Sequence, residues 1–135
     1  MISTITGKVS SIAEDSLVVE VSGLGFRIYV PRPMPVETRP GDQVLLHTNL
    51  VVREDSLTLY GFADIDQENL FRQLLGVNGV GPRLAMEILS THTPHTIRRA
   101  VAGDQPELFQ QVSGIGKKTA QKEPDQSKDT VGDKV

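Results

Sequence analysis

The stretch "GVNGVGPRLAMEIL", Gly76–Leu89, has a counterpart later in the chain, "VSGIGKKTA", Val112–Ala120. With their valines aligned, both glycines of the Gly-x-Gly and the closing alanine coincide, and Arg83 aligns with Lys118. Glycine tolerates positive φ and has no side chain to keep a neighbour away from the backbone. Each Gly-x-Gly turn between two helices therefore lets the backbone approach something closely, and this chain has two such turns.

Basic residues follow both turns: Arg83 follows the first, and Lys117 and Lys118 follow the second. The amides of such a turn and of the next helix N-terminus form an anion site. A cation at a helix N-terminus is unfavourable to the helix dipole, so an anion shared with the amides explains these residues better. The alternative is that the glycines merely join packed helices, and for one copy the two interpretations are equally good. Because the pattern occurs twice, we favour the interpretation that the two turns bind successive phosphates of one nucleic acid. Such contacts position a protein without recognising base sequence.

Residues 64–122 show the helical spacing of apolar side chains around these turns. Four apolar side chains lie on one predicted helical face, those of Leu70, Phe71, Leu74 and Leu75. Asp66 is the predicted N-cap, and Pro82 suits a first helical position. Another short helix is expected to end at Gly103, after a loop at "THTPH". We expect this region to be an all-helical, internally duplicated DNA-binding domain.

The pattern of residues 1–63 predicts β-strands instead. Period-two alternation runs through "SLVVEV" and "GFRIYVP", with a turn signal at Gly23–Gly25 between them. A longer strand is expected over Val44–Val52, with "SLTLYGF" as its hairpin partner. Five or so short strands separated by turns predict a small OB-fold-like β-barrel. The expected fold class is therefore α+β, a β-barrel followed by a helical domain.

Glu54 and Asp55 stand side by side at the tip of the predicted hairpin. On spacing alone a solvated polar turn is the favoured interpretation. If the tip faces DNA, the two carboxylates repel phosphates, disfavour a continuous duplex and favour a substrate whose strands part there.

Composition excludes several classes of protein. The 135-residue chain has no cysteine, a net charge of −3 and no apolar run of membrane-spanning length, so a cytoplasmic protein with no membrane partner is expected. His92 and His95 lack a third ligand, so no metal site is predicted. Neither Gly-x-Gly completes a Walker or dinucleotide pattern, and no catalytic arrangement can be argued from spacing. We expect no cofactor.

Four segments together resemble the RuvA family of Holliday-junction-binding proteins, which work with the RuvB branch-migration motor: "GLGFRIYVP", "VVREDSLTLYGF", "LFRQLLGVNGVGPRLAMEIL" and "VSGIGKKTA". The resemblance implies an OB-fold-like barrel that builds a homotetramer, with an octamer as the alternative, followed by tandem helix-hairpin-helix motifs. It implies an acidic pin at Glu54 and Asp55 and a non-catalytic role on four-way junction DNA. It assigns two DNA-binding hairpins, with residues Asn78, Gly79, Gly81 and Arg83 in the first and Gly114, Gly116, Lys117 and Lys118 in the second.

After the second turn the sequence departs from the family. "QKEPDQS" stands where the family has an apolar helix, and the family's linker and motor-binding third domain do not follow. Pro124 would disrupt a helix, so residues 123–135 are expected to form a frayed or disordered tail, and recruitment of a RuvB-like ATPase is not expected. The alternative function is a helix-hairpin-helix repair enzyme, a glycosylase or nuclease, or its accessory subunit.

Overall fold

The structure is a computed structural model that describes residues 1–103. It divides the chain into two compact units, with the boundary after Leu70. The first unit contains five strands and a one-turn helix, α1 (Met34–Glu37), between the third and fourth strands. The strands are β1 (Thr4–Ile12), β2 (Ser16–Val21), β3 (Leu24–Tyr29), β4 (Gln43–Arg53) and β5 (Ser56–Phe62).

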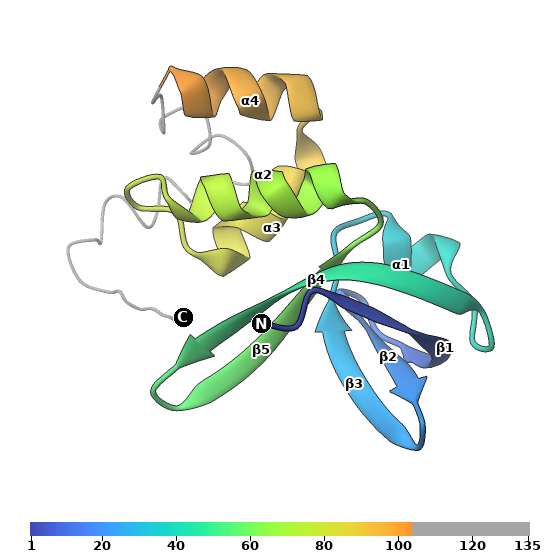
Figure 1. The fold of residues 1–135 in the computed structure, drawn as a ribbon. Coiled ribbons are helices and arrows are strands. Elements are labelled where there is room, and N and C mark those ends of the chain that lie inside the picture. The colour runs from blue at the N-terminus through green and yellow to red at the C-terminus, as the bar shows by residue number, and fades with distance from the viewer. Residues whose placement is uncertain (104–135) are drawn as a thin grey trace. The chain divides into compact units, whose positions relative to one another are not determined.

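These strands close into a barrel in the order β1-β2-β3-β5-β4, sealed where β1 and β4 pair antiparallel (Figure 1). All pairings are antiparallel except that of β3 with β5. The turn between β2 and β3 has positive φ at both Ser22 and Gly23, which matches the right-handed twist of the flanking strands. The predicted OB-fold-like barrel is therefore confirmed.

The barrel core is aliphatic. In β1 and the first half of β4 the more buried residues alternate with the more exposed ones, whereas Leu59–Phe62 of β5 are all buried. The buried cluster consists of Ile5, Val9, Leu17, Val19, Ile28, Val30, Leu46 and Leu59. Among the aromatic side chains of the barrel, Tyr29 packs against Tyr60 with ring centroids 6.0 Å apart, and Phe62 is fully buried.

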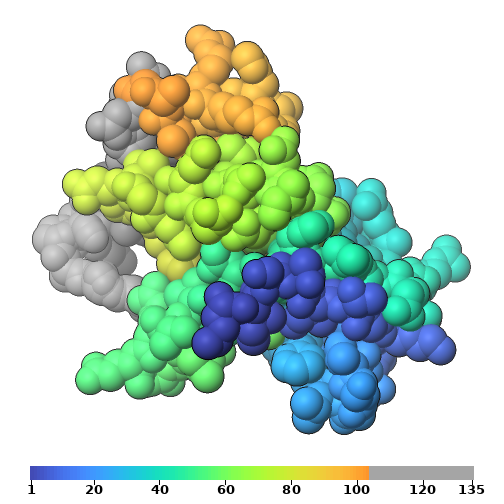
Figure 2. Space-filling view, in the orientation of Figure 1, coloured from blue at the N-terminus to red at the C-terminus, as the bar shows by residue number. Residues whose placement is uncertain are grey.

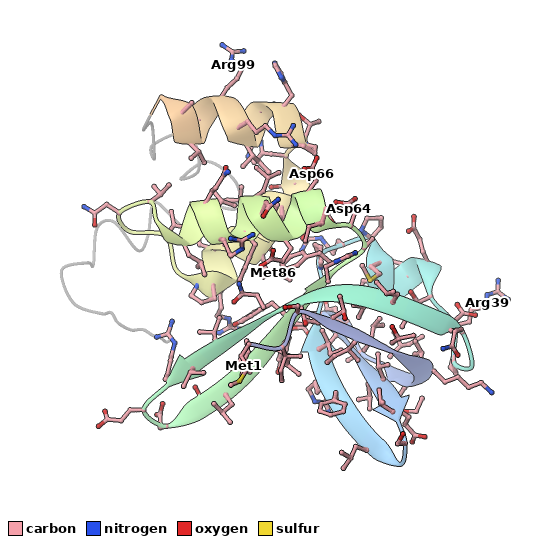
Figure 3. All side chains as sticks on the ribbon, viewed as in Figure 1. Met1, Arg39, Asp64, Asp66, Met86 and Arg99 are labelled. Atoms are coloured by element: carbon pink, nitrogen blue, oxygen red, sulfur yellow. The ribbon has the colours of Figure 1, made fainter. Side chains whose placement is uncertain are left out.

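Within the described residues three helices follow: α2 (Ile65–Leu75), α3 (Pro82–Thr91) and α4 (Pro94–Ala102). The unit boundary falls within α2. The predicted N-cap of α2 at Asp66 is wrong. Asp64 lies just before the helix, and its Oδ1 accepts a hydrogen bond from the Gln67 amide at 2.9 Å, whereas Asp66 lies inside the first turn (Figure 3).

Apolar residues from the helices form the core of the second unit. Six of them are almost fully buried from solvent: Phe71, Leu74, Ala85, Ile88, Ile97 and Ala100. The prediction of a loop at "THTPH" is only partly right, because α4 begins at Pro94. The Thr93 hydroxyl caps the helix by accepting from the Thr96 amide at 3.2 Å, and proline is favourable at the first helical position. None of the helices in the described part of the chain is long and apolar enough to cross a membrane.

Candidate nucleic-acid interface

The β4–β5 hairpin carries the predicted acidic tip. The two strands pair from His47 with Phe62 through Arg53 with Ser56, so Glu54 and Asp55 alone form the turn. The pairing of β4 with β1 ends at His47 of β4. The pairing of β5 with β3 ends at Leu59, opposite Leu50, and beyond that pair β4 and β5 form a two-stranded ribbon that extends from the barrel (Figure 2). The hairpin tip is therefore held at the end of a projecting ribbon.

Both carboxylates at this tip are exposed to solvent. No hydrogen bond or ion pair of either one is found within residues 1–103. The pair Arg53 and Ser56 joins the turn to the strands, and behind that pair Val52 and Leu57 face each other and are 65% and 72% exposed. The tip thus places two exposed carboxylates beside the exposed Arg53 guanidinium, and its net negative charge repels phosphates in its neighbourhood.

The first predicted hairpin lies between α2 and α3. Its turn runs from Val77 to Val80 and is closed by a hydrogen bond from the Val80 amide to the Val77 carbonyl at 3.1 Å. Gly79 has φ +86°, the positive value that the third residue of a type II turn requires. Val77 and Val80 are buried, whereas Asn78 and Gly79 are exposed. The valines therefore anchor the turn in the helical core and present the Asn-Gly pair to solvent.

Gly81 is the N-cap of α3, with φ −96° and ψ −179°. No side chain caps the helix, and the first helical hydrogen bond runs from the Ala85 amide to the Gly81 carbonyl at 2.9 Å. The earlier amides of the helix, those of Arg83 and Leu84, have no acceptor within the helix. The Arg83 side chain is exposed in this first turn. Uncapped amides and a guanidinium group therefore occur together at this helix end, a combination suited to binding an anion.

Neither the backbone angles nor the neighbouring atoms in the described residues require glycine at position 81. Its φ of −96° is accessible to any residue, and a Cβ added there would meet no atom within 4 Å. Serine, aspartate or asparagine would cap the helix better. The missing side chain therefore leaves room for a group from outside, such as a phosphate, to approach the amides.

The second predicted hairpin, with Gly114, Gly116, Lys117 and Lys118, lies outside the described residues, as does the 123–135 tail. Asn78, Gly79, Gly81 and Arg83 come together in one short segment of the second unit, while Glu54 and Asp55 belong to the first.

Two histidines lie at the α3–α4 junction. His92 is the C-cap of α3 and His95 is exposed in the first turn of α4. Across residues 1–103, no group of three or more His, Cys, Asp or Glu side chains is placed to hold a metal ion.

Charge is divided between the two units. Acidic side chains outnumber basic ones in Met1–Leu70, whereas the charged residues of the described second unit, apart from Glu87, are Arg72, Arg83, Arg98 and Arg99. Arg99 extends outward from α4 (Figure 3). The described part of the second unit therefore has a net positive charge, whereas the first unit has a net negative one.

One contact was missed by reasoning from the sequence. Asn49 Nδ2 donates a hydrogen bond to Glu68 Oε2 at 3.1 Å, which joins β4 to α2 within the first unit. The available signal was the position of Glu68, three residues before Phe71 and seven before Leu75, a spacing that places a carboxylate on the apolar face of the helix.

Comparison with known proteins follows the same division of the chain. The family model described as RuvA N terminal domain matches residues 1–61, and the model described as SAM-like Helix-hairpin-helix tandem matches residues 71–122. The chain is thus a five-stranded barrel followed by a helical region that matches a tandem helix-hairpin-helix model.

Similar full-length proteins carry the name Holliday junction branch migration complex subunit RuvA. The protein of Chloroflexus aggregans is 50% identical over 123 residues, which cover 90% of this chain and 63% of the relative. That of Chloroflexus aurantiacus is 47% identical over the same coverage. That of Streptomyces coelicolor is 44% identical over 135 residues, 100% of this chain and 67% of the relative. The chain thus spans about 63% of the length of the two Chloroflexus relatives.

Proposed function

The chain belongs to the RuvA family, and from that premise we propose that it binds four-way DNA junctions without regard to base sequence. It acts as the non-catalytic, junction-holding subunit of a branch migration complex, in DNA recombination and repair in the cytoplasm. The observation that carries this proposal is the uncapped N-terminus of α3 behind the Val77–Val80 turn. Its glycine at position 81 serves no need of the fold itself.

The hairpin supports phosphate contacts rather than base recognition. An exposed Asn-Gly turn, free helix amides and the Arg83 guanidinium are groups that bind phosphate oxygens. Such contacts position a protein on any duplex, so their sequence independence suits a junction whose arms vary. The second hairpin, with Gly114, Gly116, Lys117 and Lys118, supplies the matching grip in this proposal.

Preference for a junction over a duplex comes, in this proposal, from the acidic tip. Glu54 and Asp55 are exposed on a two-residue turn without compensating partners in the described chain. An intact duplex brought against this tip places phosphates near two carboxylates, which is repulsive. A four-way junction separates its strands at the crossover and leaves a space there for the tip.

The functional assembly is a homotetramer, with an octamer as the alternative, since cyclic symmetry matches one set of contacts to each of four arms. In this arrangement residues 1–63 form the assembly domain with the acidic pin, residues 64–122 the DNA-binding domain and residues 123–135 a tail. A RuvB-like ATPase is the motor partner in the family, and we do not expect residues 123–135 of this chain to recruit it. The repair-enzyme alternative needs a catalytic group in a pocket, and no observation favours one.

The deciding experiment is fluorescence anisotropy with a labelled four-way junction and a linear duplex of equal length and composition. We expect tighter binding to the junction and the same preference for junctions of unrelated base sequence. Equal affinity for the two DNAs would contradict the proposal. Incubation of the same labelled DNAs with the protein and Mg²⁺ tests the alternative, because cleaved or base-excised product would identify an enzyme.

A further inference from the structure

Asn49 and Glu68 are joined by a partly buried hydrogen bond that the proposed DNA contacts do not use. The bond runs from Asn49 Nδ2 to Glu68 Oε2 at 3.1 Å, and Glu68 is only 7% exposed. Asn49 lies on β4, paired across the ladder with Tyr60. Both residues belong to the first unit, so the bond holds the start of α2 to the barrel.

The two joined elements lead to the two proposed DNA-contact features. β4 runs on from Asn49 to the acidic tip at Glu54, and α2 runs on from Glu68 without interruption to Leu75, where the hairpin turn begins. Each element is also held close to the bond. The neighbouring Thr48 donates from its Oγ1 to the Ile2 carbonyl at 2.7 Å, and Asp64 caps the first turn of α2. The bond therefore connects two elements whose local positions are already fixed.

Stability alone is a weak reason for this pair. A glutamate in the first turns of a helix interacts favourably with the helix dipole while fully exposed. Burying its carboxylate costs desolvation energy, and apolar replacements of buried charged groups are often as stable or more so. Buried polar pairs of this kind are better explained where they select one alignment of two elements.

We propose that Asn49 and Glu68 are positioning residues: their hydrogen bond fixes the direction in which α2 leaves β4 and thereby supports selection of junction over duplex DNA. This inference rests on the proposed function. Neither residue touches DNA in this proposal, and both act through the elements that carry the tip and the hairpin.

Isosteric substitutions test the bond without changing volume. Asn49→Asp places two carboxylates against each other and breaks it. Glu68→Gln keeps an acceptor oxygen and preserves it. The double variant Asn49→Asp/Glu68→Gln reverses donor and acceptor, restores the bond and has the wild-type net charge. Gln43→Glu, at the exposed start of β4, controls for the added negative charge.

Three measurements are compared: the ratio of junction to duplex affinity, the melting temperature, and amide hydrogen exchange along α2 in the free protein. Asn49→Asp is expected to lower the affinity ratio and to speed exchange in α2, while Glu68→Gln and Gln43→Glu retain the wild-type ratio. The double variant is expected to recover both the ratio and the slow exchange.

Two results would overturn the inference. One is Asn49→Asp with a lower melting temperature but an unchanged affinity ratio, which would make the bond merely structural. The other is unchanged exchange in α2, whatever the DNA result. A wild-type chain without junction preference would instead overturn the proposed function, and the exchange data would still decide whether the bond fixes α2.

Discussion

Gly79 and Gly81 are separated by one residue, yet only Gly79 has a backbone conformation that demands glycine. Gly79 has φ +86° inside the Val77–Val80 turn, whereas Gly81 has φ −96° at the start of α3. A Cβ at either position would meet no atom within 4 Å. Folding therefore explains the first glycine, whereas for the second we propose that a group from outside approaches the backbone there, and substitution separates these two roles.

Gly79→Ala should destabilise the protein by about 1–2 kcal/mol, because a residue with a Cβ at positive φ is strained. Urea denaturation followed by circular dichroism measures the change in the free energy of unfolding. Gly81→Ser is the matched control, since its backbone conformation accepts any residue. Equal stability of the two variants would contradict the assigned turn geometry.

Gly81→Ser should weaken DNA binding without loss of stability. Serine is a good N-cap, so the free energy of unfolding should stay the same or rise by about a few tenths of a kcal/mol. Its side chain occupies the space in front of the α3 amides and competes for them with a phosphate. Anisotropy titrations with the junction measure the effect. Wild-type affinity in a folded Gly81→Ser variant would rule out phosphate contact at this helix end.

Arg83→Ala should reduce the salt dependence of binding. Removing the interaction of one side chain with one phosphate lowers the slope of log affinity against log salt by about 0.9 on duplex DNA. The slope is measured by titrations at several salt concentrations. Arg39→Ala removes an equal charge from an exposed position in the barrel unit and should leave the slope nearly unchanged. Identical slopes for both variants would place Arg83 away from the phosphates.

Glu54→Gln combined with Asp55→Asn should strengthen binding to linear duplex and narrow the preference for junctions, because two repulsive charges are removed at the tip. Stability should change little, since both side chains are exposed. Glu14→Gln with Asp15→Asn makes the same charge change in the exposed turn between β1 and β2 and should preserve the preference. If duplex affinity stays constant or falls, the tip does not act as a barrier.

Local patterns determined much of this protein from sequence alone. Alternating apolar residues specified the strands, and "SLTLYGF" is β5 to the residue. Glu54 and Asp55 were placed at a turn because polar residues interrupt two apolar strands. The Gly-x-Gly with Pro82 placed the end of one helix and the start of the next. These features depend on neighbours a few residues apart, and the sequence displays those neighbours directly.

Tertiary structure decided what depends on distant residues or on the actual backbone angles. Asp66 was the cap predicted from the sequence, and only the folded chain shows that an Asp64 oxygen reaches the Gln67 amide instead. The different roles of Gly79 and Gly81 appear only in their φ values. The Asn49–Glu68 bond spans 19 residues and requires that β4 and α2 pack together. Whether a glutamate near a helix start is solvated or buried depends on which element covers it, and that covering surface is built only when the chain folds.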